Sequence, residues 1–236
     1  MTDRFLVAQL ALVTGASRGI GAATAEALAA AGAHVVLTAR TAAGLEEVEE
    51  RIHEAGGSAT IAPLDLTESD SIARLAAALA ERWGKLDILM LNAATLGSLT
   101  PVAQIDPKEF SRVLTLNLLA NQALLAAFDP LLRQSEGGRV IAVTSSVGRH
   151  PRAYWGAYGA SKAALETLAL SYGEEVRNVS PVKVAILDPG STATTMRARA
   201  FPGEDPATIK PPEAVANAVL TLLRGGFETG ERKEVR

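Results

Sequence analysis

Tyr158 and Lys162 are the residues whose types and spacing point most directly to chemistry. They lie four positions apart in a helical stretch at about 154–176, so their side chains share one helix face. A phenol ordinarily has a pKa of about 10, and a nearby ammonium can lower the pKa of an acid by about one to three units. Tyr158 can then donate a proton to a carbonyl oxygen or take it back. Alone, this spacing is more often an ordinary surface pair, so the hypothesis depends on its surroundings.

Two other polar residues are candidates for the same reaction centre. Ser145 ends an apolar strand and precedes Tyr158 by 13 residues, so its hydroxyl can hydrogen-bond a substrate oxygen. Ser146 is the alternative by adjacency. Asn117 lies in a helical stretch that is apolar on more than one side. There it is either a satisfied buried amide or a site that distorts the helix and binds water.

A glycine-rich segment at 14–21 predicts a phosphate-binding loop, because it follows a strand and opens a helix. Gly15 allows a sharp turn, Gly19 lets the backbone approach a pyrophosphate, and Gly21 permits close packing of helix on strand. The first turn of the helix presents free N–H groups and a positive dipole end to the phosphates. The loop residues expected at the cofactor are Gly15, Ser17, Arg18, Gly19, Ile20 and Gly21.

The segment after the second strand indicates which dinucleotide binds. An acidic residue there would bind the ribose hydroxyls of NAD, but the sequence at 35–40 contains none. Arg40 and Arg18 can instead pair with a 2′-phosphate, so NADP(H) is expected in preference to NAD(H). After the third strand, Asp65 and Leu66 are expected at the adenine, although Asp65 also fits a cap or turn.

Six short apolar runs separated by helical patterns surround these residues. Near-continuous apolar runs are typical of parallel strands covered on both faces. The pattern predicts one α/β domain over 1–236, with a doubly wound parallel sheet of six to seven strands and helices on both faces. The expected strands are 10–14, 34–38, 58–64, 86–91, 139–144 and 182–187.

Start and stop signals bound the helices between these strands. Gly32, Gly56-Gly57 and Gly84 are expected to end the first three helices. A capping box is expected at 67–70, and a cap followed by proline begins a long helix at about 107–132.

Composition excludes several classes of protein. A net charge of −3 with a pI of about 5.7 argues against nucleic-acid binding. The absence of cysteine excludes disulfides, thiol catalysis and cysteine zinc sites, and three scattered histidines make a metal site unexpected. The apolar run from Phe5 to Val13 is too short to span a bilayer. A cytoplasmic protein without membrane or nucleic-acid partners is therefore expected.

Together these motifs resemble the short-chain dehydrogenase/reductase family over nearly the whole chain. The resemblance implies a Rossmann fold and a catalytic set formed by Ser145, Tyr158, Lys162 and Asn117, with Asn117 holding a water that links Lys162 to solvent. It also implies that Tyr158 and Lys162 lie at the cofactor. The further cofactor contacts that it implies are Asn92, Ala93, Pro189, Gly190, Thr194 and, as a rival of Thr194, Thr192.

The sequence departs from the family pattern at two places. Ala94 stands where relatives carry a glycine beside the cofactor, which puts the local backbone geometry in question. The chain stops at 236, where many relatives continue through a last strand into a tail, so a shortened edge strand is expected.

The leading prediction is an NADP(H)-dependent carbonyl reductase or alcohol dehydrogenase acting on a small carbonyl or secondary alcohol. A non-catalytic NADP-binding regulator or scaffold is the alternative. Apolar residues on the helices at about 107–132 and 153–178 predict a homotetramer, or failing that a homodimer. The substrate is expected against a loop at about 190–211 that can move as a lid. The candidate lining residues are Leu96, Val147, Tyr154, Trp155, Met196 and Phe201.

Overall fold

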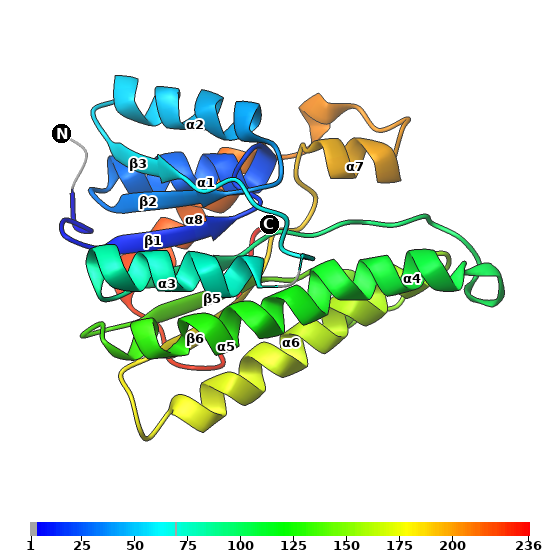
Figure 1. Cartoon of the computed structure of the whole chain (residues 1–236). Coiled ribbons are helices and arrows are strands. Elements are labelled where there is room, and N and C mark those ends of the chain that lie inside the picture. Colours follow the sequence, from blue (N-terminus) through cyan, green and yellow to red (C-terminus); the bar gives the residue numbers. More distant parts are fainter. Residues whose placement is uncertain (1–3, 69) are drawn as a thin grey trace.

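Seven parallel strands form the centre of the molecule in the computed structural model, which describes residues 4–68 and 70–236 (Figure 1). Their order across the sheet is β3-β2-β1-β4-β5-β6-β7. The order reverses between β1 and β4, where ligands bind in open sheets of this kind. The predicted doubly wound sheet is confirmed. The strands are β1 (Leu10–Thr14), β2 (His34–Thr38), β3 (Ser58–Ile61), β4 (Ile88–Leu91), β5 (Arg139–Val143), β6 (Lys183–Asp188) and β7 (Arg232–Glu234).

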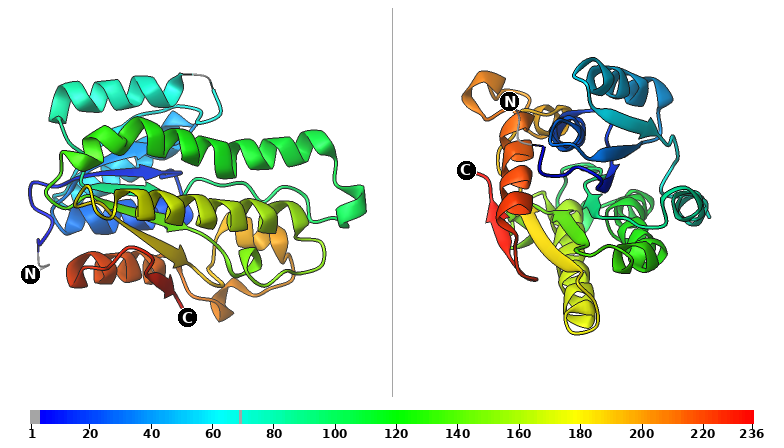
Figure 2. Two further views of the ribbon diagram at one scale, coloured as in Figure 1. Left: turned by 90° about the horizontal axis from the view of Figure 1, so that it is seen from below. Right: turned by 90° about the vertical axis from the view of Figure 1, so that its left-hand side faces the viewer.

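Helices cover both faces of the sheet (Figure 2). Successive strand residues point to opposite faces, so Ala11 and Val13 enter one core while Leu10 and Leu12 enter the other. This division explains why the strands are apolar throughout. The first face carries α1 (Gly19–Ala30), α2 (Ala42–Glu54) and α8 (Pro212–Gly225); the second carries α3 (Ser71–Trp83), α5 (Ala120–Arg133) and α6 (Gly156–Val176).

The short strand β7 closes the sheet at the edge beyond β6. Its three residues pair in parallel with Ile186 to Asp188, and Val235 N donates a hydrogen bond of 2.9 Å to Asp188 O just beyond the strand. The expected shortened edge strand is therefore confirmed.

The long helix expected at 107–132 is continuous but distorted. It begins as α4 (Pro107–Leu114), changes to a π-helical segment (Thr115–Leu119), and continues as α5. The predicted cap at its start is confirmed, since the Asp106 carboxylate accepts a hydrogen bond of 2.8 Å from Glu109 N. Asn117 lies within the π-helical segment, which is a frequent sign of a functional position in a helix.

The capping box expected at 67–70 is wrong. Helix α3 begins at Ser71, and Asp70 precedes it in a left-handed conformation without a side-chain cap. Thr67 instead donates from its backbone and its hydroxyl to the Asp65 carboxylate, at 2.8 and 2.7 Å. These local hydrogen bonds form a turn in place of the helix start; Ser69, also part of the expected box, lies outside the described residues.

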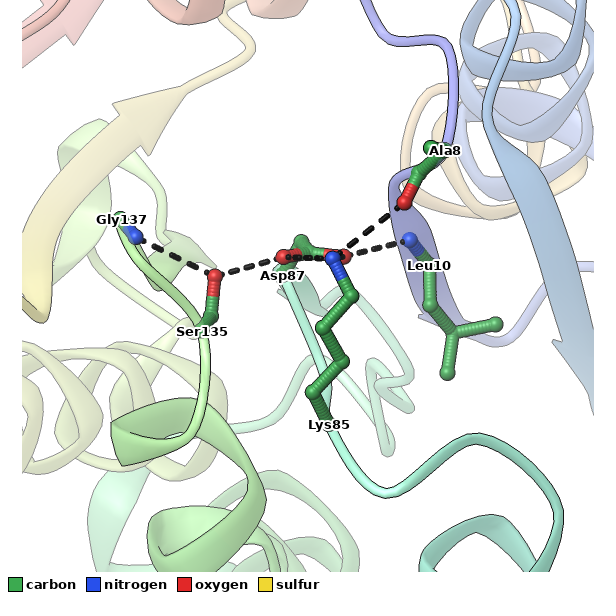
Figure 3. Close-up of polar contacts among 6 residues, drawn as sticks. All are labelled: Ala8, Leu10, Lys85, Asp87, Ser135 and Gly137. Carbon is green, nitrogen blue, oxygen red and sulfur yellow. Dashed lines mark hydrogen bonds and ion pairs between the residues drawn. The ribbon is translucent and has the colours of Figure 1, made fainter.

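Asp87 joins three segments at the amino-terminal end of the sheet (Figure 3). Its side chain is 7% exposed and accepts hydrogen bonds from Leu10 N at 2.8 Å and from the Ser135 hydroxyl at 2.6 Å. Lys85 adds an ion pair at 3.0 Å. The carboxylate thereby fixes the start of β1 against β4 and against the turn before β5.

Among the helices of the described residues, none combines the length and the apolar character that a membrane span needs.

Candidate active site

A cleft of about 1010 Å³ opens at the carboxyl ends of the central strands. It collects the glycine-rich loop after β1, the segment after β4, the end of β5, the start of α6 and the segment after β6. Of the catalytic and cofactor-binding residues predicted from sequence, all but Gly21 and Asn117 line this cleft. The lining set is Gly15, Ser17, Arg18, Gly19, Ile20, Arg40, Asp65, Leu66, Asn92, Ala93, Ser145, Tyr158, Lys162, Pro189, Gly190, Thr192 and Thr194.

The glycine-rich loop has the geometry of a phosphate cradle. Gly15 and Gly19 have φ angles of 68° and 56°, in the left-handed region that favours glycine. Gly21 lies behind the loop, where an added Cβ would come within 2.2 Å of Gly15 O. The helix can approach the loop this closely only without a side chain. The loop therefore presents bare backbone to the cleft at the start of α1, the arrangement that binds phosphate.

Thr14 and Asn92 hold the loop against the end of β4. The Thr14 hydroxyl donates to Met90 O and accepts hydrogen bonds from the backbone N–H groups of Asn92 and Ala93, all at 3.0 Å. The Asn92 amide donates back to Thr14 O at 2.8 Å. Two neighbouring parallel strands are thus locked together at the point where the cleft begins.

Arg18 and Arg40 lie at one end of the cleft, and both are exposed. Asp65 lies near them; hydrogen bonds from Thr67 lower the pKa of its carboxyl, and the charge of Arg40 adds to this effect. The Asp65 carboxylate therefore stabilises the local turn through Thr67, and the residue also lines the cleft. Two arginines lie in this part of the cleft, and no carboxylate follows directly at the end of β2. This combination of charges fits the 2′-phosphate of NADP.

Tyr158 and Lys162 lie together at the other end of the cleft. They are 8% and 1% exposed, and the Lys162 ammonium lies 5.7 Å from the centre of the Tyr158 ring. Its Nζ donates to Val143 O, the carbonyl at the end of β5, at 2.8 Å. This bond connects helix α6 to the strand that leads to Ser145.

Burial governs the protonation of both groups. It lowers the pKa of the Lys162 ammonium to about 8. It also raises the pKa of the Tyr158 phenol above its ordinary value, and the negative charge of Asp188 raises it further. The lowering of the Tyr158 pKa expected from sequence is not found, because burial removes the phenol from water and disfavours the charged phenolate. The phenol is consequently protonated at neutral pH.

Of the two candidate serines, Ser145 lines the cleft and Ser146 does not. Ser145 lies in extended backbone two residues after β5. Ser146 instead begins a 3₁₀ turn, and its carbonyl oxygen accepts hydrogen bonds from Arg149 N and His150 N at 3.0 and 2.7 Å. Ser145 is therefore the serine that shares the cleft with Tyr158.

Asn117 contacts helix α6 through Ser161 and is completely buried. Its amide oxygen accepts from Thr95 N at 2.8 Å, and its nitrogen donates to Thr95 O and to the Ser161 hydroxyl at 2.9 and 3.0 Å. Ser161 in turn donates to Tyr158 O at 2.7 Å. The interpretation of Asn117 as a satisfied buried amide is confirmed, and the residue also lies in the distorted helix segment. That it binds a water stays a prediction. Sequence reasoning missed Ser161, although its position three residues after Tyr158 was a usable signal.

The structure also clarifies the departures from the family pattern. Ala94 lies in the cleft wall without a positive φ, so its Cβ causes no backbone strain. Thr194 caps α7 (Thr195–Ala200) by accepting from Arg197 N at 3.1 Å, and its methyl would lie 3.4 Å from a Cβ added at Gly19. Thr192 is 3% exposed, and its hydroxyl donates to Pro189 O at 2.9 Å. Thr194 is thus the threonine that approaches the phosphate loop.

Of the residues expected to line the substrate end, Leu96, Trp155 and Met196 line the cleft. Val147, Tyr154 and Phe201 do not: Val147 is buried behind Tyr158, Tyr154 is 57% exposed, and Phe201 packs on Trp155 with ring centres 5.7 Å apart. Sequence reasoning did not identify several lining residues because they lie on a helix with no recognised motif. They are Glu109, Ser111, Arg112, Val113, Thr115 and Leu116.

Comparison with known proteins agrees with this geometry. Residues 9–205 match the family model described as short chain dehydrogenase. The chain belongs to the short-chain dehydrogenase family. YciK of Escherichia coli K12, an uncharacterized oxidoreductase, is 37% identical over 218 residues, which cover 91% of this chain and 86% of that protein.

Solved structures of family members superpose closely on this short-chain dehydrogenase. One from Salmonella enterica serovar Typhi is 34% identical with a TM-score of 0.95, covering 100% of this chain and 98% of that one. A Shigella flexneri 2a protein described as a short chain dehydrogenase, complexed with NADP, is 35% identical with a TM-score of 0.94, covering 100% and 99%. The chain is therefore an oxidoreductase of this family.

Proposed function

We propose that this short-chain dehydrogenase, folded as one domain, is an NADP(H)-dependent carbonyl reductase or alcohol dehydrogenase with Tyr158 as its general acid and base. The observation that carries the proposal is the meeting of Tyr158, Lys162 and Ser145 in one cleft whose opposite end holds Arg18 and Arg40. A site with a proton donor at one end and a phosphate cradle at the other supports transfer of hydride and proton to a carbonyl group.

The bound nicotinamide supplies the hydride. Ser145 holds the substrate oxygen by a hydrogen bond, and Tyr158 donates a proton to that oxygen as the carbonyl carbon is reduced. Burial keeps the proton on the Tyr158 phenol at neutral pH, which is the form that donates in this direction. Lys162, held by Val143 O, stabilises the phenolate that remains and holds the nicotinamide ribose. Asn117 keeps the catalytic helix in place through Ser161, and the same region is where a relaying water would bind.

A phenylalanine substitution at Tyr158 tests this function. Purified protein is incubated with NADPH and a panel of ketones, aldehydes, quinones and keto acids, and NADPH oxidation is followed by its absorbance. Tyr158→Phe should abolish turnover while leaving NADPH binding intact, since only the acidic hydroxyl is removed. A parent protein that binds NADPH but reduces no member of the panel would favour the non-catalytic regulator or scaffold.

Arg40 is proposed as the residue that favours NADPH over NADH. Its guanidinium is exposed at the cleft end expected to hold the 2′-phosphate, and charged hydrogen bonds of this kind contribute about 1.5–3 kcal/mol. Arg40→Ala should raise the Kd for NADPH at least tenfold and leave the Kd for NADH nearly unchanged. Equal effects on both would contradict the assignment.

We further propose that the protein forms a homotetramer, with a homodimer as the alternative. Helices α5 and α6 lie side by side on one face of the sheet, and among the described residues no layer covers their outer side (Figure 2). Leu119, at the junction with α5, is 57% exposed. Light scattering at micromolar concentration should give four or two times the chain mass of 24.6 kDa, and a monomer would refute both assemblies.

A further inference from the structure

The cleft end around Tyr158 is walled by a small apolar cluster that is separate from the two main cores. Leu96 and Val147 pack with Tyr158 at its centre. Besides Tyr158 itself, four of the cluster's residues also line the cleft, so a group bound next to the reacting carbonyl contacts hydrocarbon and an indole ring. These four are Leu96, Trp155, Met196 and Ala200.

Helix α7 places a charge beside this apolar wall. Met196, Arg199 and Ala200 all line the cleft, and their spacing of three and four residues puts them on one helix face. Met196 and Ala200 pack against the cluster that contains Tyr158. Neighbours at this spacing have Cβ atoms about 5–6 Å apart. The long side chain of Arg199 therefore reaches the space next to the apolar wall.

Arg197 cannot supply the same charge, because it is already bound. Its guanidinium forms two hydrogen bonds of 2.5 Å with the Glu204 carboxylate and lies 3.8 Å from the centre of the Phe201 ring. Arg199 has no such partner within the described part of the chain: no carboxylate forms an ion pair with it. Its positive charge is thus available to a ligand.

Positive charges outnumber negative ones in the cleft wall as a whole. In a protein whose net charge is −3, the cleft wall carries six cationic side chains and two acidic ones, Asp65 and Glu109. Arg18 and Arg40 lie at the end assigned to the cofactor phosphates, and Lys162 is bound to Val143 O. The six cations are Arg18, Arg40, Arg112, Lys162, Arg197 and Arg199.

We propose that the substrate is a carbonyl compound with an apolar body and a terminal carboxylate, and that Arg199 binds this carboxylate. The inference rests on the proposed reductase function and names its substrate class. The carbonyl lies at Tyr158 and Ser145, the apolar body lies against Leu96 and Met196, and the carboxylate pairs with the guanidinium. In the reaction the carbonyl carbon takes the hydride of NADPH and its oxygen takes the proton of Tyr158, giving an alcohol and NADP⁺.

Two aldehydes that differ in the charge of the group opposite the aldehyde test whether the substrate carries a carboxylate. 4-Carboxybenzaldehyde and methyl 4-formylbenzoate share the ring and the aldehyde, but only the first is an anion at neutral pH. We expect the parent enzyme to reduce the carboxylate with a kcat/KM at least tenfold higher than the ester. Raising the salt concentration should reduce this preference, because salt screens exposed charges.

Substitution of Arg199 by methionine keeps the apolar part of the side chain and removes the charge. Arg199→Met should lower kcat/KM for the carboxylate about tenfold, mainly through KM, as expected for loss of a hydrogen bond to a charged group. Reduction of the ester should change less than twofold. Arg152→Met is the matched control, because Arg152 is exposed in the loop before α6 and lies outside the cleft wall; it should leave both substrates unaffected.

Several results would overturn the inference. These are equal reduction of both aldehydes by the parent, an equal loss for both in Arg199→Met, and reduction of other carbonyl compounds with neither of these two accepted. The proposed reductase function is tested separately, since it fails only when no carbonyl compound supports NADPH oxidation or when Tyr158→Phe retains full turnover.

Discussion

Lys162 should give the enzyme a pH break near 8. Burial shifts the pKa of its ammonium from 10.5 to about 8, which corresponds to about 3 kcal/mol of lost hydration at about 1.4 kcal/mol per unit. The charged form dominates below this pKa and the neutral form above it. About nine-tenths of the molecules carry the charge at pH 7 and about one-tenth at pH 9. Since the charge supports the phenolate left on Tyr158, reduction should slow about tenfold between these two pH values.

The assay is the pH profile of kcat/KM for NADPH, which reports the protonation of the free enzyme. A stable reducible aldehyde is held at saturation while the pH is varied from 6 to 10 in buffers of constant ionic strength. Tyr158 contributes no break below its own raised pKa. The parent profile should be flat to about pH 7 and fall above about pH 8.

Lys162→Arg provides the decisive comparison, because a guanidinium keeps its charge across this whole range. The variant is expected to be slower, because the planar guanidinium cannot form the same hydrogen bond to Val143 O as the Lys162 ammonium. Its pH profile should nevertheless have no break near pH 8. The reasoning would be refuted by a parent profile that stays flat to pH 10. It would equally be refuted by an arginine variant that keeps the same break.

Two further predictions concern buried charges away from the cleft. Asp87→Ala removes the acceptor of the network in Figure 3 and should lower the free energy of unfolding by about 3 kcal/mol, which lowers Tm by about 6–12 °C. As a control, Arg51→Ala breaks only an exposed ion pair and should change the free energy of unfolding by less than about 1 kcal/mol. Arg232→Met removes the cation that pairs with the 8% exposed carboxylate of Glu166 on α6. Thermal denaturation should show a loss that Glu166→Gln partly restores in the double variant, because removing both partners leaves no unpaired buried charge. An Arg232→Met protein as stable as the parent would contradict this, and Lys183→Met, which breaks a more exposed pair, should have little effect.

Local spacing was enough to predict much of the candidate site. The four-residue interval between Tyr158 and Lys162 places them on one helix face whatever the rest of the fold does. The positive φ of Gly15 and Gly19 follows from the demands of a tight turn between strand and helix. The glycines at 32, 56–57 and 84 likewise follow helices that end at Ala30, Glu54 and Trp83. Such features depend on neighbours a few residues away, which the sequence states directly.

The expectations that proved wrong depended on competition between contacts. The capping box at 67–70 had suitable residue types, but the Asp65 carboxylate binds Thr67 and delays the helix to Ser71. Tyr154 and Phe201 are aromatic and near the site in sequence, yet the structure places them outside the cleft wall. Residue type alone cannot decide which of several available partners a side chain takes.

The sequence by itself determined the strand–helix alternation, the phosphate loop and the helix face that carries Tyr158 and Lys162, because each is encoded over a few adjacent residues. Only the tertiary structure decided how deeply these two groups are buried, and hence that the pKa of Tyr158 rises while that of Lys162 falls to about 8. It also decided that Arg197 is neutralised by Glu204 while Arg199 faces the cleft. The physical reason is that desolvation and ion pairing depend on which segments the crossovers of the fold bring together. The separation of two segments in the sequence does not show whether they are in contact.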